Sequence, residues 1–187
     1  RRTVGKAREG ELNIERDTSG RLIPIYRELF WRSVERWARR SREPLSVARL
    51  RASREDPTGK LEFLAERLGE NMVTWVAFHR GRPAAADIIL KGTNSFAWRG
   101  AMHEDLGPET HAAYLLQNLA IEEACADGGG FYYLGESGPA KGIALFKERF
   151  GGIGYHYPEV RYERLPYTSA NQFIRAVVKR IVGYRTS

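Results

Sequence analysis

The most constraining feature of the sequence is a change of hydrophobic period near residue 72. Three short runs rich in β-branched and aromatic residues follow, at 72–79 (MVTWVAFH), 83–90 (PAAADIIL) and 95–100 (SFAWRG). Turn-forming residues separate them at 80–82 and 91–94. Runs of this length joined by loops this short predict an antiparallel meander of three strands. Such a sheet has to bury at least one face against another layer.

The segment before the meander has a helical period. In residues 20–42, Tyr26, Phe30, Val34 and Trp37 recur at the spacing of one helix face, and most of the arginines fall on the other face. This pattern predicts an amphipathic helix with an aromatic stripe in the core. Further helices are expected at 1–10, 45–54 and 60–68, and a strand at 12–16.

The segment after the meander alternates helix and strand. We expect helices at 108–126, 143–149 and 169–182, and strands at 131–134 and 155–164. A meander followed by a β-α crossover implies a mixed, mostly antiparallel sheet with helices on both faces, which is an α/β or layered α+β fold. We expect one domain over 1–187, with an entry helix and strand at 1–19 and a basic tail helix within 165–187.

Several common chemistries lack their sequence signatures. The chain has no P-loop, no G-x-G-x-x-G, no G-x-S-x-G and no H-E-x-x-H motif, and its four histidines are not at metal-ligand spacing. Its single cysteine, Cys125, lies between two alanines and is expected to be a buried structural thiol. No apolar run approaches the length of a membrane span. We therefore expect no metal, no disulfide and no membrane span.

The charge is uneven along the chain. The formal net charge is +7, with seven arginines against two acids in residues 20–42 and six basic residues against one acid in 161–187. Such patches attract polyanions such as nucleic acid or a phosphate-rich ligand. An arginine-rich surface without a specific partner is the alternative, and charge alone does not decide between them.

The C-terminal half resembles a known family. Residues 131–152, FYYLGESGPAKGIALFKERFGG, resemble the segment of FemAB-like proteins in which a strand and a small loop lead to a helix bearing FK-x-x-FGG. The opening RRTVGKAREGEL is similar to the basic helix that introduces their second acyltransferase domain. FemAB-like proteins are built from the GCN5-related N-acetyltransferase (GNAT) fold, and the order of elements fits one such domain.

This resemblance implies an N-acyltransferase that moves an acyl group from acyl-CoA to an amine by direct attack. The acceptor would be a small molecule or a cell-wall precursor, in peptidoglycan, exopolysaccharide or secondary-metabolite synthesis. The setting would be the bacterial cytoplasm. Because FemAB-like enzymes usually have two such domains, an N-terminal companion domain is also implied.

Two candidate catalytic residues lie in this C-terminal segment. Glu136 is the only carboxylate of the loop GESGPAKG and would accept the proton of an attacking amine; an ordinary solvated loop acid is the alternative. The resemblance places Lys147, the lysine of FK-x-x-FGG, at the substrate site, where its charge would stabilise a phosphate or an oxyanion. The alternative is a helix lysine that favours the C-terminal dipole.

In the GNAT fold the acyl donor binds after the fourth strand and at the start of the next helix. The matching residues here are Ala101, Met102, Gly107 and Thr110. This stretch lacks the usual Q/R-x-x-G-x-G/A pattern and carries three acids, Glu104, Asp105 and Glu109, which would repel a pyrophosphate.

A second departure is that FYYL lacks the Asp that FemAB-like proteins often carry in this strand. These departures leave two alternatives open. One is an aminoacyl-tRNA donor, and the other is a non-catalytic GNAT-fold binding module.

Four further residues are candidate contacts with the acceptor. They are Arg99, His103, Phe146 and Tyr155, which lie around the predicted donor loop and the FK-x-x-FGG turn. Packing is the alternative for the two aromatic residues.

Overall fold

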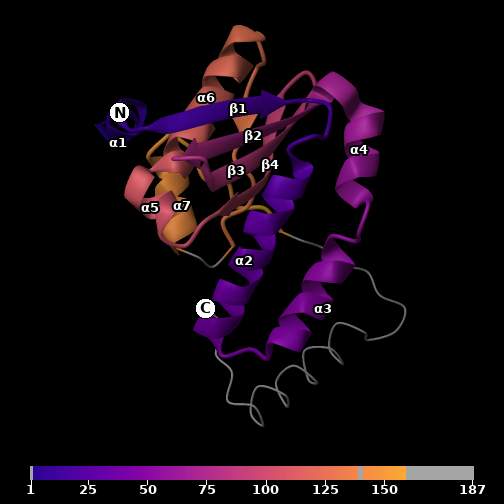
Figure 1. Ribbon diagram of the computed structural model, residues 1–187. Coiled ribbons are helices and arrows are strands. Elements are labelled where there is room, and N and C mark those ends of the chain that lie inside the picture. The colour runs from indigo at the N-terminus through magenta and orange to yellow at the C-terminus, as the bar shows by residue number, and fades with distance from the viewer. Residues whose placement is uncertain (1, 139–140, 159–187) are drawn as a thin grey trace.

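The computed structural model describes residues 2–138 and 141–158 (Figure 1). Its first elements are α1 (Arg2–Glu9), β1 (Leu12–Asp17), α2 (Ile23–Ser41), α3 (Leu45–Glu55), α4 (Lys60–Leu68) and the short 3-10 helix η1 (Gly69–Asn71). There follow β2 (Met72–His79), β3 (Arg82–Lys91), β4 (Ser95–Met102), α5 (Leu106–Thr110), α6 (Ala112–Ala126), β5 (Tyr132–Tyr133) and α7 (Lys141–Glu148).

The strands form one sheet in the order β1-β2-β3-β4-β5. The first four pair antiparallel in sequence order, and only β4 and β5 are parallel. The meander predicted for 72–100 is therefore confirmed, and so is the mostly antiparallel mixed sheet.

Helices cover both faces of the sheet, as the sequence predicts (Figure 1). On one face, α2, α3 and α4 enclose the largest core cluster, in which Tyr26 and Leu29 of α2 meet Val76 of β2 and Ile88 of β3. On the other face, Leu116 and Ala120 of α6 pack on the sheet. The result is a three-layer arrangement with the sheet in the middle.

The aromatic stripe of α2 differs from the prediction at its C-terminal end. Tyr26, Phe30 and Val34 are buried, but Trp37 is 47% exposed and Ala38 takes its place in the core. Arg36, expected on the solvent face, is only 5% exposed. The helix turns this face toward the end of β4, where a buried arginine finds a hydrogen-bond acceptor.

The helix expected at 108–126 is wrong in its boundaries, because two helices replace it. His111 has φ of 56° and ends α5 in the left-handed region before α6 begins. The sequence gives no Gly or Pro signal at this position.

Several smaller expectations are also corrected. Cys125 is exposed rather than buried. The strand expected at 131–134 shrinks to Tyr132–Tyr133, and residues 155–158 have no regular structure. The remainder of the strand expected at 155–164 and the tail at 165–187 lie outside the described residues. No helix in the described part of the chain is both long and apolar enough to cross a membrane.

Candidate functional site

The sheet opens where β4 and β5 diverge. The two strands pair only at Ser95–Tyr132 and Phe96–Tyr133. Beyond this point no described strand pairs with residues 98–102 on the side away from β3. Peptide groups along an unpaired strand edge bind extended ligands that carry amide groups. The open edge of β4, defined here as residues 98–102, is therefore the candidate site.

A β-bulge sets which residues flank this edge. The register between β3 and β4 shifts so that Ile88 faces Arg99 and Ile89 faces Ala97, which leaves Trp98 as the extra residue. Trp98 packs against the core beneath α2–α4, and the Arg99 guanidinium carbon lies 5.1 Å from the Trp98 ring centroid. Arg99, a predicted acceptor contact, is thus beside the open edge, and its Nε is buried without a partner in the described structure.

One functional candidate escaped the sequence analysis. Asp87 of β3 is directly opposite Gly100 of β4, and burial raises the pKa of its carboxyl to about 7. Gly100 is exposed at the open edge. The available signal was a single acid among alanines and isoleucines, and the prediction of a strand over these residues assigned no role to it.

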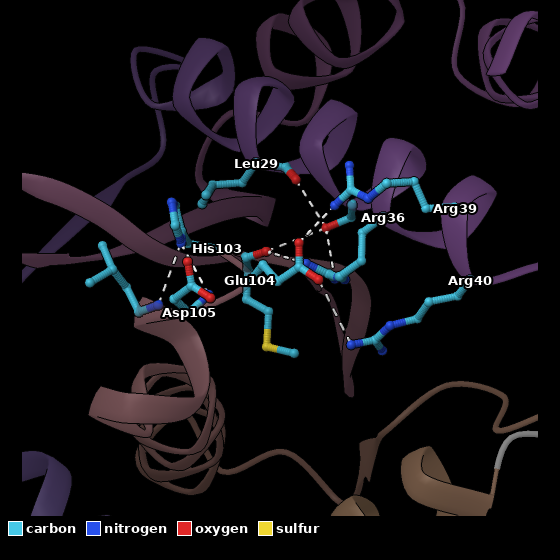
Figure 2. A network of polar contacts seen from close by, with 10 residues as sticks. Leu29, Arg36, Arg39, Arg40, His103, Glu104 and Asp105 are labelled. Atoms are coloured by element: carbon cyan, nitrogen blue, oxygen red, sulfur yellow. Dashed lines mark hydrogen bonds and ion pairs between the residues drawn. The ribbon is translucent and has the colours of Figure 1, made fainter.

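The end of β4 is held by α2, as Figure 2 shows. The Met102 carbonyl accepts a hydrogen bond from Arg36 Nη1 at 3.1 Å and one from Ser33 Oγ at 3.4 Å. Arg36 Nη2 also donates to Ser33 Oγ at 3.2 Å. The buried arginine therefore ties the end of β4 to α2, next to residues 103–110, the predicted donor loop.

The predicted donor-binding residues do gather at this end of β4. Ala101 is buried in the sheet, and Gly107 is buried so close to Met102 that a Cβ there would lie 2.9 Å from the Met102 Cβ. The Thr110 hydroxyl donates to the Leu106 carbonyl inside α5. Ala101 and Gly107 could therefore contact a ligand mainly through their backbone.

The acids of the donor loop are partly compensated by α2. Glu104 binds Arg39 at 2.8 Å and lies 3.9 Å from Arg40 (Figure 2). His103 Nδ1 accepts from the backbone N–H groups of Asp105 and Leu106, at 3.2 and 3.4 Å. His103 thus orders the loop through its ring. The arginines reduce the repulsion that the sequence alone predicts for an anionic donor.

Lys147 lies where β4 and β5 diverge beyond Phe96 and Tyr133, a place called the fork below. Its Nζ donates to the Gly135 carbonyl at 2.7 Å, and Gly135 in turn is packed against the Ala97 carbonyl. Gly135 has φ of 75°, which favours glycine at this turn. Burial lowers the pKa of Lys147, and the charge of Glu136 acts in the opposite direction.

Glu136 is exposed and accepts a hydrogen bond from the Tyr157 hydroxyl. This bond raises the pKa of Tyr157 to about 12. The carboxylate therefore lies near the fork, on its solvent side.

The remaining two candidates differ in their surroundings. Phe146 packs on Phe150 and on Tyr114 of α6, with ring centroids 5.2 and 4.7 Å apart, and so fixes α7 to α6. Tyr155 is 82% exposed. Contact with an acceptor stays a prediction for both.

The family model described as "Acetyltransferase (GNAT) domain" matches residues 1–147. The chain belongs to this GNAT acetyltransferase family. A comparison with curated proteins finds no significant match.

Solved structures support the GNAT fold. A ribosomal-protein-alanine N-acetyltransferase from Brucella melitensis is 12% identical with a TM-score of 0.51, over 81% of this chain and 99% of that one. An aminoglycoside acetyltransferase from an uncultured soil metagenomic sample, in complex with sisomicin, is 14% identical with a TM-score of 0.53, over 83% and 97%. At these identities the likeness establishes the fold alone.

The GNAT domain described here shows no metal centre within residues 2–138 and 141–158. No group of three or more His, Cys, Asp or Glu side chains in these ranges is placed to hold a metal ion.

Proposed function

We propose that this chain is an N-acyltransferase that transfers an acetyl or related acyl group from acyl-CoA to an amine. The observation that carries the proposal is the open edge of β4 in a GNAT-family domain. Membership of the GNAT family implies acetyl-CoA as the donor. Its pantetheine arm carries amide groups that suit the unpaired backbone of residues 98–102.

The chemistry would be direct attack without a covalent enzyme intermediate. A neutral amine attacks the thioester carbonyl, and orientation together with stabilisation of the developing oxyanion supplies most of the rate. We assign the oxyanion contact to Lys147, because its ammonium lies at the fork beside Gly135 and Ala97. Glu136 remains the sequence-based candidate for proton acceptance, and Arg99 and His103 for contact with the acceptor.

We further propose that the chain is FemAB-like. The resemblance of the FK-x-x-FGG segment supports this proposal. The packing in this structure explains its second glycine, since a Cβ on Gly152 would lie 2.8 Å from Leu134 Cδ1 and 3.0 Å from the Lys147 carbonyl oxygen. On this proposal the acceptor is an amine of a small molecule or a cell-wall precursor, the location is cytoplasmic, and a companion GNAT domain precedes this one.

The first experiment is a calorimetric titration with acetyl-CoA, longer acyl-CoAs and free CoA at two salt concentrations. Micromolar binding supports the acyl-CoA donor. Absence of binding to a folded protein overturns it and favours aminoacyl-tRNA, which would bind with a strong salt dependence, or a non-catalytic module.

The second experiment measures release of free CoA in the presence of an amine panel. The panel holds an aminosugar, a peptide with a free α-amine, a lysine side chain and a polyamine. Lys147→Met should lower kcat, whereas Lys141→Met, at the exposed start of the same helix, should retain it. Equal activity of the two variants would remove Lys147 from the reaction.

A further inference from the structure

The middle of the sheet contains a single carboxyl group, that of Asp87. Asp87 is at the centre of β3, opposite Trp75 of β2 on one side and Gly100 of β4 on the other. Because directly paired residues share a face, Asp87 lies on the face covered by α6, where Trp75 packs.

This group is poorly compensated. Asp87 is partly exposed, and its carboxyl has no hydrogen-bond or ion-pair partner among the described residues. The Nε1–H of Trp75 on the same face is buried without a partner there. The polar neighbours known on this face are Tyr132 of β5 and Gln117 of α6, which bond to each other at 2.7 Å. An apolar residue would suit such a position better. The presence of Asp87 at this position therefore indicates a functional role.

Gly100 makes the carboxyl accessible from the open edge. A Cβ built on Gly100 would lie 2.9 Å from Asp87 Oδ1, so the carboxyl occupies the space that a side chain of β4 would fill. Gly100 itself is exposed. A reactant lying along residues 98–102 would therefore pass close to the carboxyl at Gly100, where β4 carries no side chain.

We propose that Asp87 is the proton acceptor for the attacking amine. The inference rests on the proposed acyl transfer and deepens it by assigning a catalytic residue that belongs to neither the donor loop nor the FK-x-x-FGG segment. Glu136 lies on the solvent side of the fork, bonded to Tyr157, whereas Asp87 lies beside the open edge.

The step balances as follows. The substrate ammonium gives one proton to the Asp87 carboxylate, and the nitrogen lone pair forms a bond to the thioester carbon while the carbonyl π pair moves onto oxygen. Collapse re-forms the carbonyl and breaks the C–S bond, whose electron pair leaves on sulfur. The thiolate takes the remaining excess proton from nitrogen, and Asp87 later returns its proton to water.

The electrostatic surroundings suit this role. Burial raises the pKa of Asp87 to about 7, close to the value at which a general base is most effective at neutral pH. The titratable groups that its charge reaches are Tyr132 of β5 and Tyr26 of α2. Both tyrosines have pKa values raised by burial and stay neutral in this range.

The test is the pH dependence of CoA release by Asp87→Asn. In the wild type, kcat should rise with pH through about 7 as Asp87 ionises. The variant should lose this rise and lower kcat by about 10²–10⁴-fold, while calorimetry shows unchanged binding of acetyl-CoA. Asp127→Asn, a surface acid paired with Lys91, is the matched control and should keep the wild-type profile.

A second variant separates loss of the proton acceptor from a general folding defect. Gly100→Ala keeps the carboxylate but places a methyl group against Asp87 Oδ1, and it should lower kcat in a protein that unfolds cooperatively. A wild-type pH profile in Asp87→Asn overturns the assignment, and loss of the rise in Glu136→Gln alone transfers the role to Glu136. A wild type that binds acetyl-CoA yet releases no CoA with any amine overturns the proposed function itself, a result distinct from failure of Asp87 alone.

Discussion

At the scale of single residues, Asp87 couples the stability of the fold to pH. Its folded-state pKa of about 7 is above the ordinary value of 3.8, so the folded state binds more protons than the unfolded state between these values. Stability contributed by the neutral carboxyl is therefore present at low pH and is lost as pH rises toward and through 7.

Asp87→Asn should remove this dependence. For the wild type, the contribution of Asp87 to the free energy of unfolding should fall by roughly 2–3 kcal/mol between pH 5 and pH 8. Urea denaturation of both proteins at the two pH values measures the difference. A wild-type curve that falls no more steeply than that of the variant would contradict the raised pKa, whatever the outcome of the kinetic test.

Arg36 is the second residue whose environment matters. Replacing it with methionine keeps the apolar contacts but leaves the Met102 carbonyl with only the long Ser33 bond. We expect a loss of about 1–3 kcal/mol of stability. Arg40→Met, at an exposed site on the same helix, should change stability by less than about 0.5 kcal/mol. Equal effects in chemical denaturation would show that the buried bond does not stabilise the end of β4.

At the scale of elements, the junction of α5 and α6 is strained at one backbone position. His111 adopts φ of 56°, a conformation that glycine enters more easily. His111→Gly should therefore stabilise the protein by roughly 0.5–1 kcal/mol. Ala113→Gly, inside α6, should destabilise it by about as much. Thermal unfolding of the pair checks the break between the helices, since a continuous helix would make both substitutions unfavourable.

The FGG turn after α7 gives a second test at this scale. Gly152→Ala places a methyl group against Leu134 and the Lys147 carbonyl, so we expect a loss of about 1–3 kcal/mol. Gly142→Ala is the control, because a Cβ there meets nothing within 4 Å and α7 gains a better helix former. If both variants unfold at the wild-type temperature, the turn is not packed as described.

At the scale of the whole molecule, ligand binding at the open edge should stabilise the entire domain. β4 is bonded to β3, its end is held by α2, and residues 103–110 lead through α5 into α6, so the open edge is connected to the helices on both faces of the sheet. Acetyl-CoA at 100 times its dissociation constant should add about 2.7 kcal/mol and raise Tm by roughly 5–10 °C. A thermal-shift series in acetyl-CoA measures this, and a flat series would exclude tight binding to the folded state.

The sequence predicted most of the elements, because their signals are local. Strand β2 and helix α4 have the predicted bounds, since period, Gly and Pro are read over a few residues. The break at His111 and the shortness of β5 escaped, because neither carries a local signal. For the candidate site, local motifs pointed to residues 103–110 and Lys147, whose roles stay predictions, and gave no sign of Asp87 or Arg36.

What the sequence determined by itself is the order of helices and strands, the layered fold and the family resemblance in the FK-x-x-FGG segment. Only the tertiary structure decided that Asp87 lies against Gly100, and that Arg36 reaches the carbonyl of Met102, 66 positions along the chain. The physical reason is that hydrophobic period reflects neighbours in sequence. The environment of a buried charge is set by strand register and helix packing, which bring distant residues together.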